Sequence, residues 1–258
     1  MATESTTQKK YRSPDGLPTD ICLFTITTEP RRDTKNKALP DLTLKVLLIQ
    51  RDPKSDRFPG YWAFPGGFST EHETIDACAE RELREETHLS PEAVHIEQLR
   101  TYYAPGRDPG GWIPTVVYYA LVNESRLSGF KADDDAADAR LFSVEEAMGM
   151  QLAFDHNLIL QDALQRVQEK MLQTNIAKEF LPREFTLSEL LKVIETVVPS
   201  FQADRSNFGK KLVSTQARKG IIEIATDAHG REKYSNSTSQ TKAKLYRFTD
   251  YVPPLTIY

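Results

Sequence analysis

Residues 67–90, GFSTEHETIDACAERELREETHLS, change from apolar to acidic along one predicted helix face. The segment 73–87 is predicted to be helical, and at about 100° per residue its first half places Ile75, Cys78 and Ala79 on one side. The second half continues that side with three carboxylates: Glu82, Glu85 and Glu86. Their i, i+3 and i+4 spacing makes them neighbours. The same side of the predicted helix is therefore apolar in its first half and acidic in its second half.

The clustered carboxylates repel one another unless a positive partner lies close. Like charges at these spacings destabilise a helix by a few tenths of a kcal/mol per pair, and burial raises that cost. Mg²⁺ binds oxygen ligands and is typically held by a few carboxylates together with substrate phosphates. Two interpretations follow, a solvated glutamate-rich helix or one wall of a metal and phosphate site.

A longer pattern favours the second interpretation. Five residues separate Gly67 from Glu73, and seven separate Glu73 from Arg81. The fixed positions are Gly67, Glu73, Arg81, Glu82, Leu83, Glu85 and Glu86. This spacing resembles the Nudix box of the Nudix hydrolase superfamily, and it would arise by chance in roughly a few chains per million.

The resemblance implies a role for each matching residue. Glu82, Glu85 and Glu86 would bind Mg²⁺ or Mn²⁺, and the carbonyl of Gly66 would add a ligand. Arg81 would orient the acidic groups, and its i, i+4 spacing from Glu85 permits an ion pair. Nudix enzymes hydrolyse a nucleoside diphosphate linked to another group, with the metal polarising the pyrophosphate and activating water. Arg81 and the three glutamates are accordingly predicted to be catalytic.

The two ends of the predicted helix carry their own expectations. Glu73 is placed in the first turn, where the helix dipole favours an acid. His88 stands where the superfamily pattern has glycine, which supplies the left-handed residue that ends the helix. Histidine tolerates that backbone region at a cost of about 1–2 kcal/mol. We therefore predict that His88 caps the helix, with metal ligation as the alternative.

The rest of the N-terminal half predicts an α/β fold. Strands are expected at residues 21–28, 42–50, 94–104 and 115–122. Strands intermixed with a helix predict an α/β sandwich. The Nudix resemblance specifies an α/β/α sandwich with a mixed sheet.

The C-terminal half is predicted to form a winged helix-turn-helix. Helices are expected at residues 155–172, 186–198 and 204–214, and strands at 220–226 and 243–248. Asp155 is a predicted N-cap, and Thr186 and Glu189 have capping-box spacing. Three helices followed by a hairpin is the order of a winged helix.

Four parts are therefore expected. They are a flexible tail at 1–17, a Nudix domain at 18–153, a linking helix at 154–174 and a winged-helix DNA-binding domain at 175–258. The polar start lacks the apolar segment of a secretory signal, and no apolar run is long enough to cross a bilayer. A cytoplasmic protein without a membrane role is expected. Cys22 and Cys78 are expected to be buried thiols.

The net charge of −4 conceals an asymmetry along the chain. Residues 204–247 contain 10 Lys or Arg against 4 Asp or Glu. This basic region is expected to neutralise DNA phosphates, with Asn207 able to reach a base edge. The predicted DNA-binding residues are Arg205, Asn207, Lys210, Lys211, Arg231, Lys242 and Lys244. A solvated basic face or a dimerisation module is the alternative, and Gly209 is unfavourable inside a recognition helix.

Several stretches narrow the resemblance to one branch of the superfamily. RDPGGWIPTVVYYALV, LAFDHNLIL, EFTLSELLKVIETVV and AKLYRF resemble the Nudix-related transcriptional regulators of NAD metabolism. This branch fuses a Nudix domain that binds ADP-ribose to a winged helix that binds operator DNA as a dimer. The resemblance implies an ADP-ribose-responsive regulator that retains hydrolase capacity. A Mg²⁺-dependent ADP-ribose pyrophosphatase whose C-terminal domain serves assembly is the alternative.

The nucleotide pocket is predicted from arginines near glycine-rich turns. Arg51 ends a strand and is expected to bind phosphate, and Arg107 or Asp108 is expected to contact the ligand from the GRDPGG loop. Gly67 is placed in the same pocket. Two aromatics, Trp62 and Phe64, either stack on a base or pack in the core, and packing is the more frequent role. Phe154 and His156 are expected to be structural.

Overall fold

The computed structural model describes residues 16–29, 39–129, 139–215, 220–235 and 242–251. The predicted tail at 1–17 lies almost wholly outside these residues. At the centre is a mixed sheet in the order β3-β2-β1-β5-β4, with β6 also paired to β2. The strands are β1 (Thr19–Glu29), β2 (Asp41–Gln50), β3 (Trp62–Ala63), β4 (His95–Tyr102), β5 (Thr115–Asn123) and β6 (Ala139–Ser143). Only β1 and β5 run parallel, and the other pairs are antiparallel.

Alternating side chains of the central strands enter two separate cores. Phe24 of β1 and Tyr119 of β5 belong to one core, while Leu23 and Tyr118 belong to the other. Burial on both faces explains why β5 is an almost continuous apolar run instead of an alternating one. The four predicted strands are confirmed. β3 and β6 were not predicted, because two and five residues give too short a pattern.

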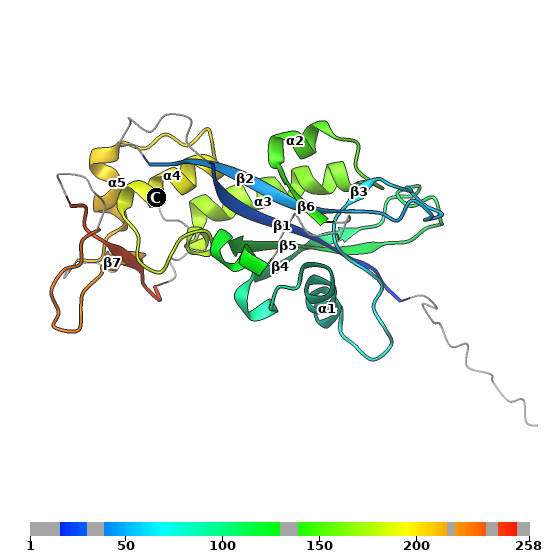
Figure 1. Ribbon diagram of the computed structural model, residues 1–258, viewed down its shortest axis with the longest axis horizontal. Helices are drawn as coiled ribbons and strands as arrows, with labels where there is room; N and C mark the ends of the chain where they lie inside the picture. Colours follow the sequence, from blue (N-terminus) through cyan, green and yellow to red (C-terminus); the bar gives the residue numbers. More distant parts are fainter. Residues whose placement is uncertain (1–15, 30–38, 130–138, 216–219, 236–241, 252–258) are drawn as a thin grey trace, which may run out of the picture.

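Helices cover both faces of the sheet. Figure 1 shows α1 (Ile75–Thr87) on one side and α2 (Val144–Gly149) with α3 (His156–Gln173) on the other. Short 3₁₀ helices lie at η1 (Pro91–Ala93), η2 (Glu124–Gly129) and η3 (Ile176–Glu179). The predicted α/β sandwich with a mixed sheet is confirmed. None of the described helices is long and apolar enough to span a bilayer.

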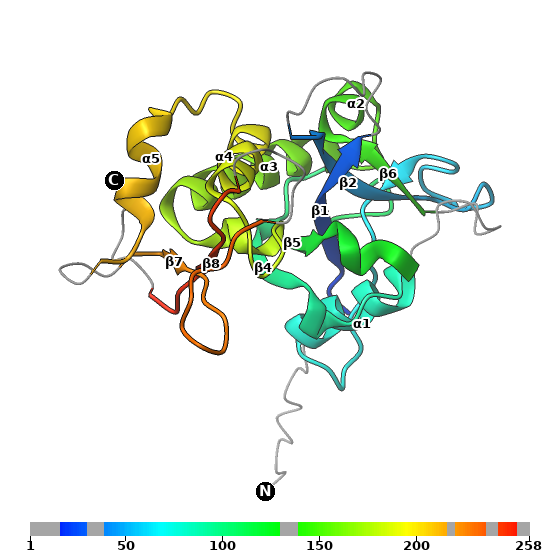
Figure 2. The same ribbon diagram turned by 60° about the vertical axis from the view of Figure 1, so that its left-hand side comes forward.

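The C-terminal segment forms α4 (Leu187–Val197), α5 (Arg205–Leu212) and a small antiparallel pair, β7 (Ile222–Ile224) with β8 (Tyr246–Phe248). Figure 2 shows these elements beside the sandwich, with α5 and β7 at its outer end. α4 begins with the predicted capping box, in which the Thr186 hydroxyl accepts from the Glu189 N–H and the Glu189 carboxylate accepts from the Thr186 N–H. The sequence thus located α4 by its cap chemistry.

The predicted linking helix α3 is also a layer of the sandwich. Its buried face, which includes Ile159 and Ala163, belongs to one apolar core that extends from β1 to Tyr246 of β8. The predicted N-cap position is confirmed. Asp155 lies at the N-cap position, but its side chain makes no capping bond, because it pairs with Arg107 instead. The first turn of α3 is therefore tied to a distant loop.

Candidate functional site

The acidic face belongs to α1, whose ends are defined by local hydrogen bonds. Thr74 caps the N-terminus by accepting from the Ala77 N–H, so the helix begins two residues later than predicted. Glu73 consequently precedes the helix, where its carboxylate accepts the Thr70 N–H. His88 has φ 56° and ψ 14° and donates its N–H to the Arg84 carbonyl. The predicted left-handed cap at His88 is confirmed.

Arg81 organises the carboxylates around it. Its guanidinium contacts Glu73 at 2.9 Å, Glu82 at 2.6 Å and Glu85 at 3.1 Å, and it donates to the Phe68 carbonyl. The predicted i, i+4 pair with Glu85 is present. One cation therefore serves three anions, which leaves this face of α1 with excess negative charge.

Glu86 extends the excess negative charge of α1 toward the protein interior. It is half-buried, and its Oε2 accepts the N–H of Gly66 at 2.8 Å. Burial, opposed by the Gly66 hydrogen bond and assisted by the charges of Glu82, Asp20 and Glu85, raises the pKa of Glu86 to about 7. A carboxyl with such a pKa is where a bound cation would relieve repulsion.

Gly66 and Gly67 bring the loop before α1 against these carboxylates. A Cβ on Gly66, which has φ 156°, would lie 2.0 Å from the Thr19 carbonyl oxygen. A Cβ on Gly67 would lie 2.3 Å from the Glu82 carboxylate. Gly66 is required for this close approach to backbone, whereas a side chain at Gly67 would have to displace the Glu82 carboxylate.

The donor chemistry suits a hard divalent cation, although the side chains are not arranged around one. Among the described residues, no three His, Cys, Asp or Glu side chains converge in a geometry that could hold a metal ion. The physical reason is Arg81, which draws the carboxylates of Glu82 and Glu85 toward its own guanidinium. The three glutamates share one helix face with an uncompensated charge at Glu86, so oxygen donors and negative charge are both present for Mg²⁺ or Mn²⁺.

A pocket of about 100 Å³ adjoins the glycine loop. Its lining comes from β1, from the loop after β2, from the glycine loop and from the loop between β4 and β5. The lining residues are Pro18, Thr19, Asp20, Arg51, Arg57, Gly66, Gly67, Phe68, Arg107, Asp108, Thr115 and Phe154. All four predicted ligand residues lie here, together with Asp20 and Arg57, which the sequence analysis missed.

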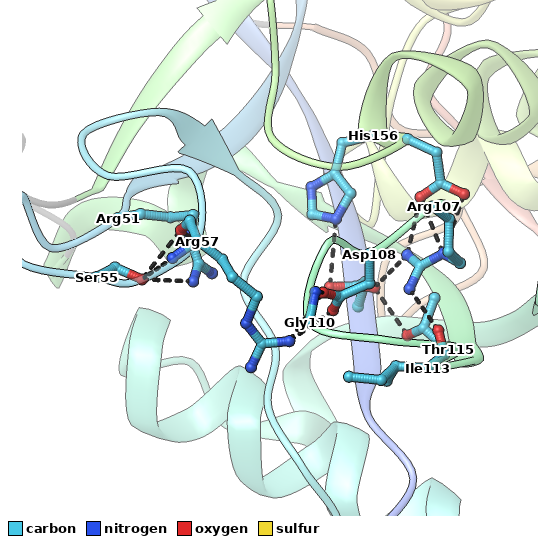
Figure 3. A network of polar contacts seen from close by, with 11 residues as sticks. Arg51, Ser55, Arg57, Arg107, Asp108, Gly110, Ile113, Thr115 and His156 are labelled. Carbon is cyan, nitrogen blue, oxygen red and sulfur yellow. Dashed lines mark hydrogen bonds and ion pairs between the residues drawn. The ribbon is translucent and has the colours of Figure 1, made fainter. Parts of the chain in front are cut away.

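Arg107 is a structural member of this pocket. Its side chain is 4% exposed, its Nε and Nη2 donate to Asp155, and its Nη1 donates to the Ile113 carbonyl. Figure 3 shows Arg107 beside Ile113, whose carbonyl accepts from its Nη1. Each of its three nitrogens is engaged within the chain, which fixes the guanidinium in place, while two of its five N–H groups have no such bond among the described residues. Contact between Arg107 and a ligand stays a prediction.

Asp108 is likewise committed within the chain. Both of its oxygens contact Nη1 of Arg57, at 2.9 and 2.8 Å, and Oδ1 also accepts the Gly110 N–H (Figure 3). Arg51 donates to the Arg57 carbonyl and to the Ser55 hydroxyl, and its guanidinium lies 5.0 Å from the Phe154 ring centroid. The cationic groups that line the pocket come from Arg51, Arg57 and Arg107, of which Arg107 is the most enclosed.

Asp20 lines the pocket and lies next to the buried His156. His156 is 1% exposed and accepts the Phe64 N–H at Nδ1, so its proton is placed on Nε2, 3.5 Å from an Asp20 oxygen. Burial lowers the pKa of His156 to about 3, which keeps the ring neutral. Burial raises the pKa of Asp20 to about 6, opposed by the Thr115 hydroxyl and by Arg107. Asp20 was not predicted as a site residue, although an acid at the start of an apolar strand is a signal for one.

The aromatic residues near the site pack as expected. Phe64 is buried and its ring stacks on His156 at 4.8 Å, while Trp62 packs edge-on against Phe142. The aromatics that line the pocket are instead Phe68, 39% exposed, and Phe154. Cys22 and Cys78 are both buried free thiols, as predicted.

The predicted DNA-binding residues lie on α5 and on the extended hairpin around β7 and β8. Arg231 pairs with Asp227 at 2.9 Å and Lys244 pairs with Glu232 at 2.9 Å. Lys242 is exposed. The side chain of Arg205, and the basic residues at 218 and 219, lie outside the described residues.

On α5, the described side chains form local contacts. Asn207 donates to Asp204 and accepts from Lys210. Gly209 faces α4, because a Cβ there would lie 2.5 Å from a methyl carbon of Leu187. This contact explains the glycine inside α5 by helix packing, and it places Gly209 on the inward face.

Comparison with known proteins agrees with the box spacing and the sandwich. The family model described as NUDIX domain matches residues 33–165, just over half of the chain. The chain belongs to the Nudix family. This Nudix chain is 32% identical over 211 residues to the ADPR responsive transcriptional repressor NtrR of Acinetobacter baylyi, an alignment that covers 80% of the chain and 76% of that protein.

Two further relatives extend the comparison. An ADP-ribose pyrophosphatase of Methanocaldococcus jannaschii is 39% identical over 118 residues, which cover 46% of the Nudix chain and 64% of that enzyme. The crystal structure of Shewanella oneidensis NrtR complexed with a 27mer DNA superposes with a TM-score of 0.68 at 27% identity. That superposition covers 93% of the present chain and 98% of the other. The likeness to the regulator therefore includes the C-terminal segment.

Proposed function

We propose that this Nudix protein is an ADP-ribose-responsive transcriptional regulator of NAD metabolism. The observation that carries the proposal is the fusion of a Nudix site to a C-terminal basic segment, in an arrangement similar over 93% of the chain to a regulator solved with DNA. The A. baylyi relative, named an ADP-ribose-responsive repressor, aligns with 80% of the chain.

The C-terminal segment is the proposed winged-helix DNA-binding domain, at residues 175–258, joined by the linking helix at 154–174 to the Nudix domain at 18–153. The order α4, α5, β7 and β8 is that of a helix-turn-helix followed by a hairpin wing. α5 would be the recognition helix. Asn207 would reach base edges, and Lys210 and Lys211 would contact phosphates, with the hairpin residues Arg231, Lys242 and Lys244 beside the backbone. Because such domains bind palindromic operators in pairs, we expect a homodimer.

The Nudix site is proposed to bind ADP-ribose with its diphosphate near the glycine loop. The pocket is lined by three arginines, Arg51, Arg57 and Arg107, and its glycine loop contacts the acidic face of α1. A divalent cation bound by Glu82, Glu85 and Glu86, with the Gly66 carbonyl, would supply charge to polarise the diphosphate and activate water. Arg81 would position these carboxylates.

A second activity is favoured by the intact acidic set. Glu82, Glu85, Glu86 and Arg81 are all present, so the regulator is proposed to retain hydrolysis of ADP-ribose to AMP and ribose 5-phosphate. The relative from M. jannaschii, named an ADP-ribose pyrophosphatase, supports this substrate. A pure pyrophosphatase whose C-terminal segment serves assembly is the remaining alternative.

One assay separates the regulator from the pure enzyme. The full chain is mixed at low salt with duplexes from upstream of its own gene and of NAD-biosynthesis genes, and a shuffled duplex of equal length is the control. A regulator retards a specific duplex, and ADP-ribose changes that retardation. Hydrolysis without any specific DNA binding would overturn the regulator and leave the pyrophosphatase.

A further inference from the structure

His156 fixes the first turn of α3 to the segment that leads into the glycine loop. Its Nδ1 accepts the Phe64 N–H at 3.0 Å, and its ring stacks on the Phe64 ring with 4.8 Å between centroids. Phe64 lies two residues before Gly66, whose N–H donates to Glu86 on the acidic face of α1. His156 is buried, so both contacts form where water does not compete. One residue of the linking helix therefore holds the loop of the Nudix site.

The residues just before α3 are bound to the same site. The Ala153 N–H donates to the Trp62 carbonyl at 2.8 Å, and the Asp155 carboxylate accepts from Arg107. Phe154, which lies between them and lines the pocket, has φ 52°. A bulky residue in that left-handed region is an outlier, and it persists only where the surrounding contacts hold it. The entry into α3 is therefore set by the geometry of the pocket.

His156 has a second nitrogen that is not satisfied. Because Nδ1 accepts, the proton is assigned to Nε2, and this atom is buried without a hydrogen-bond partner among the described residues. Oδ1 of Asp20 lies 3.5 Å away, about 0.5 Å beyond an ordinary N–H···O hydrogen bond. Oδ2 of Asp20 instead accepts the Thr115 hydroxyl at 2.8 Å. A buried donor without an acceptor is unfavourable, so a small shift that joins Asp20 to His156 would gain a hydrogen bond.

Asp20 is the pocket acid that a bound anion would disturb. The groups whose charges act on it are Arg107, Asp155, Arg51 and Glu86. Arg107 and Arg51 attract its carboxylate, whereas the two acids repel it. Arg57, the third arginine of the pocket, is already paired with Asp108. A ligand that brings phosphate charge to these arginines therefore weakens their attraction for Asp20 and repels its carboxylate.

The far end of α3 packs against the proposed DNA-binding segment. Gln168 donates from Nε2 to the carbonyl of Val197, the last residue of α4, at 3.0 Å. Val167 and Met171 belong to the same apolar core as Ile194 of α4, and Figure 2 shows the two helices side by side. α3 is one unbroken helix of 18 residues, which is about 27 Å long at 1.5 Å per residue. A close-packed helix moves as a unit, so a shift of its first turn reaches α4.

We propose that His156 is a positioning residue of the Nudix site and the joint through which an occupied pocket acts on the DNA-binding segment. An anionic ligand displaces the Asp20 carboxylate toward His156, and the carboxylate then accepts the N–H of Nε2. The first turn of α3 moves with His156, and α4 moves with α3. That the ligand is ADP-ribose, and that DNA binding responds to it, rests on the proposed function, while the joint requires only an anion in the pocket.

Two substitutions at His156 separate its two bonds. His156→Phe keeps a ring that stacks on Phe64 but removes both nitrogens. His156→Asn keeps an acceptor near the position of Nδ1 for the Phe64 N–H and lacks the donor that faces Asp20. In both variants we expect saturating ADP-ribose to change operator affinity less than about threefold, against at least about tenfold in wild type. Without ADP-ribose, operator affinity is expected to stay within about twofold of wild type, because neither variant changes the C-terminal segment.

Gln168→Ala tests the distant end of the same path. It removes the bond to the Val197 carbonyl without touching the pocket, and it is expected to lower the effect of ADP-ribose on operator affinity to about threefold. Thr25→Val is the matched control, because it removes a buried hydrogen bond from β1 to the Val122 carbonyl, outside the joint. This control is expected to keep the full effect, and thermal melts check that each variant folds.

Fluorescence anisotropy with the operator duplex gives these affinities, in EDTA to prevent turnover, and hydrogen exchange of the same full-length samples follows the amides of α4. In wild type and Thr25→Val, ADP-ribose is expected to change the exchange of α4, and in His156→Asn that change is expected to be lost. The joint is overturned if folded His156→Asn and Gln168→Ala keep the full effect on operator affinity. It is also overturned if ADP-ribose bound to wild type leaves the exchange of α4 unchanged.

The same measurements separate the joint from the proposed function. An effect of ADP-ribose on operator affinity that persists in both His156 variants leaves the function and removes the joint. A change in α4 exchange that depends on His156, with no effect on operator affinity, leaves the joint and removes the function. Wild-type protein that binds no ADP-ribose overturns both.

Discussion

The pocket and the C-terminal hairpin both contain many charges, but they arrange them differently. In the pocket, charges are shared, since one Arg81 serves three glutamates and one Asp108 faces two arginines. On the hairpin, cations and acids pair one to one, as with Arg231 and Asp227. Shared charges leave an excess that a ligand can satisfy, whereas paired charges on a surface are largely balanced. Unbalanced charges cost more free energy when they are buried, so the shared charges of the pocket indicate a ligand site.

The largest expected contrast is in stability. Arg107→Ala removes the guanidinium that contacts both Asp155 and Asp20 in a buried network. We therefore expect the free energy of unfolding to fall by about 3 kcal/mol. Arg231→Ala removes one member of an exposed pair and is expected to leave the urea midpoint unchanged within error. Urea denaturation of the two variants measures both. Equal shifts in midpoint would mean that the buried network is no more important to folding than a surface pair.

The acidic face of α1 provides the next contrast, in turnover. Glu86→Gln removes the half-buried carboxylate that the proposed cation would bind, and we expect kcat/KM for ADP-ribose to fall at least about 100-fold. Glu80→Gln, an exposed neighbour on the same helix, is the matched control and is expected to keep full activity. Production of AMP in the presence of Mg²⁺ reports the rates. Similar rates for wild type and Glu86→Gln would remove Glu86 from the chemistry.

The buried pair Asp20 and His156 predicts an unusual pH dependence. The pKa of His156 in the folded protein, about 3, lies below its unfolded value, so its contribution to stability is present above about pH 6.5 and is lost as the pH falls. The pKa of Asp20, about 6, lies above its unfolded value of 3.8, so its contribution is present at low pH and is lost as the pH rises through 6. Between pH 7 and 5 the two effects oppose each other.

Asp20→Asn should therefore expose the His156 effect. We expect the variant to lose about 2 kcal/mol of stability from pH 7 to 5, and the wild type to lose less than about 1 kcal/mol. Urea titrations at the two pH values make the comparison, and the other charged groups of the network, Arg107 and Asp155, are present in both proteins. Parallel pH profiles for the two would contradict the assigned protonation states.

The smallest expected effect concerns the hairpin. Glu232 pairs with Lys244 at 2.9 Å, so Glu232→Gln frees a cation and removes a negative charge from the proposed DNA-facing surface. We expect DNA affinity to rise about threefold, with a steeper dependence on salt. Glu195→Gln, on α4, is the control. Unchanged affinity would indicate that the hairpin does not approach the DNA backbone.

The part of this site that was predictable is the part that lies within one helix. Spacing alone located Glu82, Glu85 and Glu86 on a common face, and the missing glycine at His88 predicted its left-handed backbone. Cap chemistry likewise located the start of α4 at Thr186. These features depend on residues that are close in sequence.

The arginine network was not predictable, because it depends on loops that meet only in the folded chain. Arg57 and Asp108 are 51 residues apart and approach each other from separate loops. Asp155 lies at the predicted N-cap position, but its side chain binds Arg107, which is 48 residues away in sequence. Short elements such as β3 also escaped prediction, since their two residues pair only because β2 lies beside them.

The central claim is that ligand in the Nudix pocket controls the C-terminal domain. The most direct test is the affinity of the full chain for its operator duplex, measured by fluorescence anisotropy with and without ADP-ribose on one sample, with Glu86→Gln used to prevent turnover. We predict that saturating ADP-ribose weakens DNA binding at least about tenfold, within the usual range of coupling between two sites. An operator affinity that is identical with and without bound ADP-ribose would contradict the account.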